Sequence, residues 1–124
     1  MNGLDVLVVD DDRPLCEALR EVLTEAGYSV SCAYSADQAC AMLQREGYNI
    51  VVSDWSLPGD GETIVSYVRQ HLEGVPVVII SGEFPDDMAP IEAYPVAAHL
   101  AKPVEARVLL ATMRDVESRP DRRH

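Results

Sequence analysis

Short apolar runs alternate with stretches of helical periodicity along this chain, and the alternation is what most constrains its fold. Most of the runs are followed by apolar residues spaced three and four apart, as on one face of a helix. The runs predict five strands, at Leu4–Val9, Tyr28–Tyr34, Asn49–Ser53, Val75–Ile80 and Ala97–Ala101. Strand–helix repeats of this length require right-handed crossovers, so we expect a parallel sheet with helices on both of its faces.

Capping residues mark where the predicted helices begin and end. Asp12 and Ser35 have side chains that can accept hydrogen bonds from the free backbone amides at the start of a helix. Gly27 and Gly74 stand where helix C-termini favour glycine. A final helix is predicted from Val104 to about Ser118.

Composition excludes several classes of protein. The chain has 124 residues, which is enough for one domain with its own core. Its net charge of −11 argues against binding of nucleic acid or of an anionic membrane by this chain. The longest apolar run is far shorter than the ~20 residues of a membrane span, and the first residues lack the pattern of a signal peptide. We therefore expect a cytoplasmic protein in which Cys16, Cys32 and Cys40 are reduced and buried.

Polar residues stand at the ends of four of the predicted strands. Asp10 and Asp11 follow the first strand, and Asp54 follows the third. Ser81 follows the fourth strand, and Lys102, the only lysine, follows the fifth. In an open parallel sheet the carboxyl ends of the strands lie at one edge, where ligands bind. Each residue alone has an ordinary explanation as part of a turn or loop, but together they predict one site.

Phosphoryl transfer is the chemistry that these residues share. Two carboxylates about 4 Å apart repel by roughly 4 kcal/mol at an effective dielectric constant near 20, so a fold that keeps Asp10 beside Asp11 has a use for a cation. Carboxylate oxygens are the ligands that Mg²⁺ prefers. Asp54 can attack phosphorus as a nucleophile. Lys102 can neutralise one phosphoryl oxygen, and the Ser81 hydroxyl can donate a hydrogen bond to another.

Four motifs, in this order along the chain, carry a resemblance to a known family. They are Asp10-Asp11, Asp54-Trp55-Ser56-Leu57-Pro58, Ser81-Gly82 and Lys102-Pro103. With them the chain resembles the receiver domain of two-component response regulators over almost its whole length. The resemblance implies an α/β, flavodoxin-like, doubly wound five-stranded sheet of order 2-1-3-4-5. It also implies that Asp54 takes a phosphoryl group from a histidine kinase or a histidine phosphotransfer protein, and so switches partner binding.

The same resemblance assigns the metal and catalytic roles. Mg²⁺ would be bound by the Asp10-Asp11 pair, by Asp54 and by the backbone carbonyl of Ser56. Asp54, as the phosphoacceptor, would work with Ser81 and Lys102. The chemistry implied is Mg²⁺-dependent self-phosphorylation and autodephosphorylation, and the domain is not a metabolic enzyme.

Further roles follow from position in the same family pattern. Ser81 and His99 stand at the switch positions. Ser56 and Glu83 stand at positions that modulate the lifetime of the phosphate, and Gly82 is the small residue that leaves room for the phosphoryl group. An output domain or a second copy would bind a face made of the segment after the fourth strand, the fifth strand and the last helix.

The chain departs from the family pattern at two places. His99 replaces the usual tyrosine or phenylalanine three residues before the lysine. It is either an ordinary, partly exposed histidine on an edge strand or a working switch whose coupling depends on pH near its unperturbed pKa of about 6.5. The segment Phe84–Val96, where the family has its fourth helix, contains Pro85, Pro90 and Pro95. Because an interior proline costs a helix about 3 kcal/mol, we expect this element to be short or irregular.

Two other classes compete with this interpretation. A pseudo-receiver would act only as a binding scaffold, but the complete set of pocket residues argues against it. A haloacid-dehalogenase-like phosphatase needs a second aspartate two residues after its nucleophile, and this chain has Ser56 there. We expect a receiver domain over residues 1–118, followed at residues 119–124 by a polar tail or the start of a linker.

Overall fold

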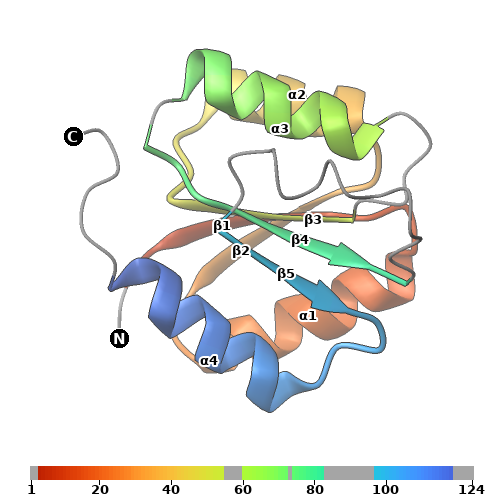
Figure 1. The fold of residues 1–124 in the computed structure, drawn as a ribbon, viewed down its shortest axis with the longest axis vertical. Helices are drawn as coiled ribbons and strands as arrows, with labels where there is room; N and C mark the ends of the chain where they lie inside the picture. Colours follow the sequence, from red (N-terminus) through yellow and green to blue (C-terminus); the bar gives the residue numbers. More distant parts are fainter. Residues whose placement is uncertain (1–2, 55–59, 73, 83–96, 119–124) are drawn as a thin grey trace.

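The structure, a computed structural model, is a five-stranded parallel sheet between two layers of helices (Figure 1). It describes residues 3–54, 60–72, 74–82 and 97–118. The strands are β1 (Asp5–Val9), β2 (Ser29–Ala33), β3 (Ile50–Asp54), β4 (Val77–Ser81) and β5 (Ala98–Ala101). The described helices are α1 (Arg13–Glu25), α2 (Ala36–Arg45), α3 (Asp60–His71) and α4 (Ala106–Glu117). The spatial order is β2-β1-β3-β4-β5 and every pair is parallel, which confirms the expected flavodoxin-like sheet.

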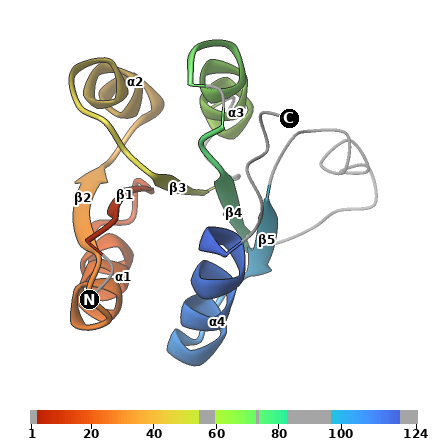
Figure 2. The ribbon, with the colours of Figure 1, turned by 90° about the vertical axis from the view of Figure 1, so that its left-hand side faces the viewer.

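The sheet is covered on both faces. Helices α1 and α4 lie on one face and α2 and α3 on the other, as the edge-on view shows (Figure 2). Strand β1 shows the alternation that this arrangement requires. Val6 and Val8 pack on the α1/α4 side, whereas Leu7 and Val9 pack on the α2/α3 side. All four side chains are buried, so β1 lies in the centre of the core.

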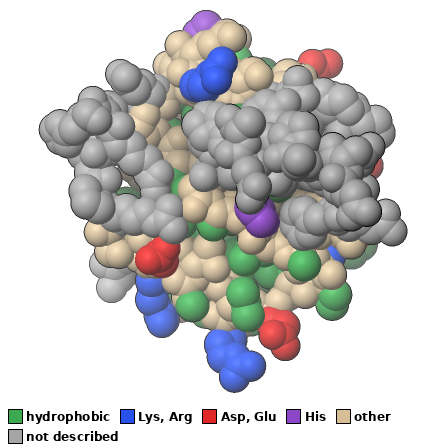
Figure 3. All heavy atoms as spheres, viewed as in Figure 1, with side chains coloured by type: hydrophobic (Ala, Val, Ile, Leu, Met, Phe, Trp, Pro, Cys, Tyr) green, Lys and Arg blue, Asp and Glu red, His purple; other side chains and the backbone are tan. Residues whose placement is uncertain are grey.

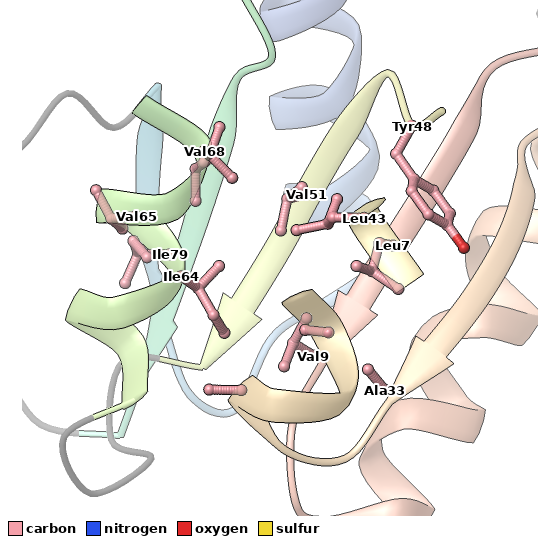
Figure 4. Packing of buried hydrophobic residues seen from close by; sticks show 13 residues of the cluster. Leu7, Val9, Ala33, Leu43, Tyr48, Val51, Ile64, Val65, Val68 and Ile79 are labelled. Carbon is pink, nitrogen blue, oxygen red and sulfur yellow. The ribbon is translucent and has the colours of Figure 1, made fainter. Parts of the chain in front are cut away.

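Buried apolar side chains fill the layer between the sheet and helices α2 and α3 (Figure 4). Leu43 of α2 and Ile64 of α3 pack against Leu7, Val51 and Ile79 from three neighbouring strands. Burying a side chain of this size contributes about 1.5–3 kcal/mol. Because helices pack on both faces of the sheet, the strands have fixed positions, and so do the residues that follow their carboxyl ends.

The predicted caps are confirmed. The Asp12 carboxylate accepts a hydrogen bond from the Leu15 amide at 3.2 Å, and the Ser35 hydroxyl accepts one from the Gln38 amide at 3.1 Å. Gly27, which follows α1, has a φ of 103°, the left-handed region that favours glycine. These local signals set the ends of the first two helices.

Some boundaries differ from those expected. Strand β4 begins at Val77 and not at Val75, because Pro76 has no amide hydrogen for the ladder, although its carbonyl accepts a bond from Val51 N at 3.0 Å. The last helix begins at Ala106 and not at Val104. The expected short or irregular element at 84–96 lies outside the described residues.

The cysteines are only partly as predicted. All three are free, but Cys16 alone is buried, whereas Cys32 and Cys40 are partly exposed. Cys32 lies on β2, an edge strand with a neighbour on one side only. Among the described residues, no helix combines the length and the apolar character that crossing a membrane requires.

Candidate functional site

Side chains from three strand ends meet at the carboxyl edge of the sheet. Asp10 follows β1, Asp54 is the last residue of β3, and Lys102 follows β5. The Lys102 Nζ lies 3.2 Å from Asp10 Oδ2 and 3.3 Å from Asp54 Oδ2. Since β1 and β3 are hydrogen-bonded neighbours, the two carboxylates are adjacent, and one ammonium group contacts both.

A third carboxylate completes the cluster. Asp10, Asp11 and Asp54 each offer an oxygen, and these oxygens all lie within 4.8 Å of one another. Asp11 is exposed, whereas Asp10 and Asp54 are only 2% and 3% exposed. Three carboxylates and one ammonium give the cluster a formal charge of −2.

Burial and charge shift the pKa values of two of these groups. Burial raises the pKa of Asp10, the hydrogen bond from the Asp12 amide opposes this, and the Asp54 charge raises it further. For Lys102 burial acts to lower the pKa, but the neighbouring Asp10 and Asp54 outweigh it and raise the pKa. Lys102 is therefore a permanent cation at neutral pH, held between two acids.

One oxygen of the cluster lacks a hydrogen bond. Asp10 Oδ2 is buried and, within the described part of the chain, no donor reaches it in hydrogen-bond geometry. The Lys102 ammonium is close to it, with Nζ 3.2 Å away in an ion pair. A buried carboxylate oxygen in this state is suited to a cation ligand, because water cannot reach it to satisfy it.

The turn from β1 to α1 holds Asp10 in place. Its amide donates to Ala33 O at 3.1 Å, and its Oδ1 accepts from the Asp12 amide at 2.9 Å. The Cys16 thiol donates to the Asp10 carbonyl at 3.2 Å. Sequence reasoning missed this last contact, and the only signal for it was the place of Cys16 on the apolar stripe of α1, close in sequence to the acidic pair.

Of the other residues predicted for the site, the structure places Ser81, Gly82 and His99. Ser81 ends β4 and is buried, and its carbonyl accepts a hydrogen bond from the Lys102 amide at 2.9 Å. A Cβ added to Gly82 would meet Lys102 Cδ at 4.0 Å, so Gly82 lies beside the lysine stem. His99 is exposed on the edge strand β5. Ser56 and Glu83 lie outside the described residues.

Comparison with known proteins shows the family of this chain. The family model for the response regulator receiver domain matches residues 6–114. The response regulator protein FleR of Pseudomonas aeruginosa is 38% identical over 108 residues, which are 85% of this chain and 23% of that protein. The chain thus spans less than a quarter of the length of that curated relative.

Solved structures agree with this relationship. A putative response regulator from Chloroflexus aurantiacus is 31% identical with a TM-score of 0.85, over 95% of this chain and 100% of that one. The chemotaxis response regulator CheY4 of Vibrio cholerae is 26% identical with a TM-score of 0.85, over 93% of this chain and 99% of that one. The chain therefore belongs to the response regulator receiver domain family of two-component systems.

Proposed function

We propose that this domain accepts a phosphoryl group on Asp54 in a reaction that requires Mg²⁺. The observation that carries the proposal is the position of Lys102 Nζ, within 3.3 Å of both Asp10 and Asp54, beside a third carboxylate. A lone structural ion pair needs one acid, whereas a phosphoryl-transfer site needs a nucleophile, metal ligands and a cation together.

The residues present fit a bound Mg²⁺ ion. Asp10, Asp11 and Asp54 would hold it, since they offer three oxygens at mutual reach, a formal charge of −2 with the lysine included, and one buried oxygen without a hydrogen bond. When bound, the ion would neutralise the charge of the phosphoryl oxygens. The backbone carbonyl of Ser56 is proposed as a further ligand from the family pattern alone.

The side chains of the site would share the work of the transfer. An oxygen of Asp54 attacks phosphorus, so that an O–P bond forms while the bond from phosphorus to the donor's imidazole nitrogen breaks and that nitrogen keeps the electron pair. Lys102, already in place, pairs with the incoming charge, and the Ser81 hydroxyl donates a hydrogen bond to a phosphoryl oxygen. Preorganised charges of this kind cost no rearrangement during the reaction.

The donor would be a histidine kinase or a histidine phosphotransfer protein, and we expect both partners in the cytoplasm. The output face would include β5 and α4, together with 84–96. Val108 of α4 is 41% exposed, and apolar side chains gather over the part of the surface where α4 and β5 lie (Figure 3). An output domain or a second copy of the chain would bind there, with Ser81 and His99 as the switch residues and Ser56 and Glu83 setting the lifetime of the phosphate.

Intact-mass spectrometry after incubation with acetyl phosphate and Mg²⁺ tests the proposal. The wild-type chain should gain one phosphoryl group, and Asp54→Asn should gain none. Asp5→Asn is the matched control, because Asp5 is an exposed aspartate at the amino end of β1, whereas the site lies beyond the carboxyl ends of the strands. That variant should gain one phosphoryl group like the wild type. A folded wild-type chain that stays unlabelled would favour the scaffold alternative, and labelled Asp54→Asn would move the acceptor elsewhere.

A further inference from the structure

The Cys16 thiol lies against the backbone of the acidic pair. Its Sγ is 3.2 Å from the carbonyl oxygen of Asp10, in a contact that is fully buried. The Cys16 amide also donates a hydrogen bond to Asp12 O at 3.0 Å, and the Asp12 amide donates one to Asp10 Oδ1 at 2.9 Å. These three bonds close a ring that joins the first turn of α1 to the end of β1.

The thiol can only be the donor in this contact. The carbonyl oxygen of Asp10 has no hydrogen to give, and the Cys16 side chain is fully buried, so its S–H points to that acceptor and not to water. Cys32 of β2 contacts the backbone of the same residue: its thiol donates a hydrogen bond to the Cys16 carbonyl oxygen, with Sγ and O 3.8 Å apart.

We propose that Cys16 is a positioning residue for the metal site, which it serves by fixing the backbone of Asp10 through the thiol-to-carbonyl hydrogen bond. The residue touches neither metal nor phosphoryl group and acts only through Asp10. Because Asp10 is a metal ligand only under the proposed function, this role depends on that function.

Isothermal titration with MgCl₂ of three variants tests the proposal. Cys16→Ala removes the donor and should weaken Mg²⁺ binding about threefold, in line with the loss of one modest hydrogen bond. Cys16→Ser keeps a donor of similar size and should bind Mg²⁺ like the wild type. Leu19→Ala also removes buried apolar surface from the same helix but leaves the Cys16–Asp10 hydrogen bond in place, so it should bind Mg²⁺ like the wild type as well.

A kinetic measurement separates positioning from general loss of stability. In phosphorylation by acetyl phosphate, Cys16→Ala should require about threefold more Mg²⁺ for half-maximal rate, with an unchanged rate at saturating Mg²⁺. Wild-type affinity in Cys16→Ala, or equal weakening in Cys16→Ser or Leu19→Ala, would overturn the positioning role alone. Absence of Mg²⁺ binding by the wild-type chain would overturn the metal site, and this role with it.

Discussion

Replacement of Lys102 by methionine probes the charge balance of the site. Methionine keeps much of the length and volume of the side chain but leaves two nearly buried carboxylates without their cation. At the observed distances of 3.2 and 3.3 Å, each lysine–carboxylate contact is worth about 5 kcal/mol before desolvation, at an effective dielectric constant near 20. Asp10 and Asp54, with oxygens no more than 4.8 Å apart, then repel by at least about 3.5 kcal/mol on the same scale.

The net loss of stability in Lys102→Met is smaller than these Coulomb energies. Desolvation of the ammonium group offsets part of its attraction, and removing one partner from a buried ion pair typically costs 3–5 kcal/mol. Since the pKa of Asp10 is already raised by burial, this carboxyl can also take up a proton in the variant and limit the penalty. We expect Lys102→Met to lower the free energy of unfolding by about 3 kcal/mol at neutral pH without metal.

The loss of stability in Lys102→Met should depend on pH. The raised pKa of Asp10 determines whether this loss grows or shrinks as the pH rises. A carboxyl whose pKa is higher in the folded state than in the unfolded state keeps its proton longer when folded, so stability falls as pH rises between the two values. Loss of Lys102 raises the folded pKa further and widens that window. The difference in stability between Lys102→Met and the wild type should therefore be small near pH 4, where Asp10 carries a proton for part of the time, and largest at neutral pH.

Urea denaturation followed by far-UV circular dichroism, in the presence of EDTA, measures this difference. Arg107→Met is the control, because Arg107 is an exposed cation on α4 and its loss changes the net charge equally. The reasoning would be refuted if Lys102→Met were no less stable than Arg107→Met, or if its deficit were the same at pH 4 and at neutral pH.

Three further outcomes are expected. Asp11→Asn removes a proposed metal ligand and relieves carboxylate repulsion, so without metal the variant should be at least as stable as the wild type. Mg²⁺ at a hundredfold excess over Kd should stabilise the wild type by about 2.7 kcal/mol, and it should raise the melting temperature of Asp11→Asn by less. Equal shifts in the two proteins would remove Asp11 from the proposed metal site. Leu109→Ala, at a fully buried position of α4, should cost 2–5 kcal/mol in urea denaturation, and a loss below 1 kcal/mol would mean that α4 contributes little to the core. Amide hydrogens of residues 84–96 should exchange among the fastest outside the termini, because three prolines interrupt the segment, and strong protection across Pro90 would show that the propensity argument is wrong.

Local signals explain why most of the fold was predictable. Asp12 and Ser35 cap their helices through bonds to backbone amides three residues away, so a short window of sequence contains all that is needed. The strand ends were predictable for a related reason. A parallel sheet brings all its carboxyl ends to one edge, so the alternation was enough to expect Asp10, Asp54 and Lys102 on the same side of the molecule. Their contacts at 3.2 and 3.3 Å depend in addition on the strand order and on the length of the lysine side chain.

Contacts that depend on packing depth were not predictable. Cys16 was expected to be an inert buried residue, and its bond to the Asp10 carbonyl depends on how closely the first turn of α1 sits on β1. The partial exposure of Cys32 depends on its place on an edge strand. The strand order implied by the family resemblance already put the second strand there, but the prediction for Cys32 did not use it. Neither follows from residue type and spacing, because both are set by distances between elements and not within them.

Direct localisation of the phosphoryl group tests the central claim most sharply. An acyl phosphate on aspartate is reduced by borohydride to homoserine, so tandem mass spectrometry of the treated protein reports which carboxylate had been phosphorylated. After incubation with Mg²⁺ and acetyl phosphate, we predict homoserine at position 54 and unchanged aspartate at positions 10 and 11. Homoserine at position 10 or 11, or a borohydride-resistant phosphate on Ser81, would contradict the assignment of Asp54 as the acceptor.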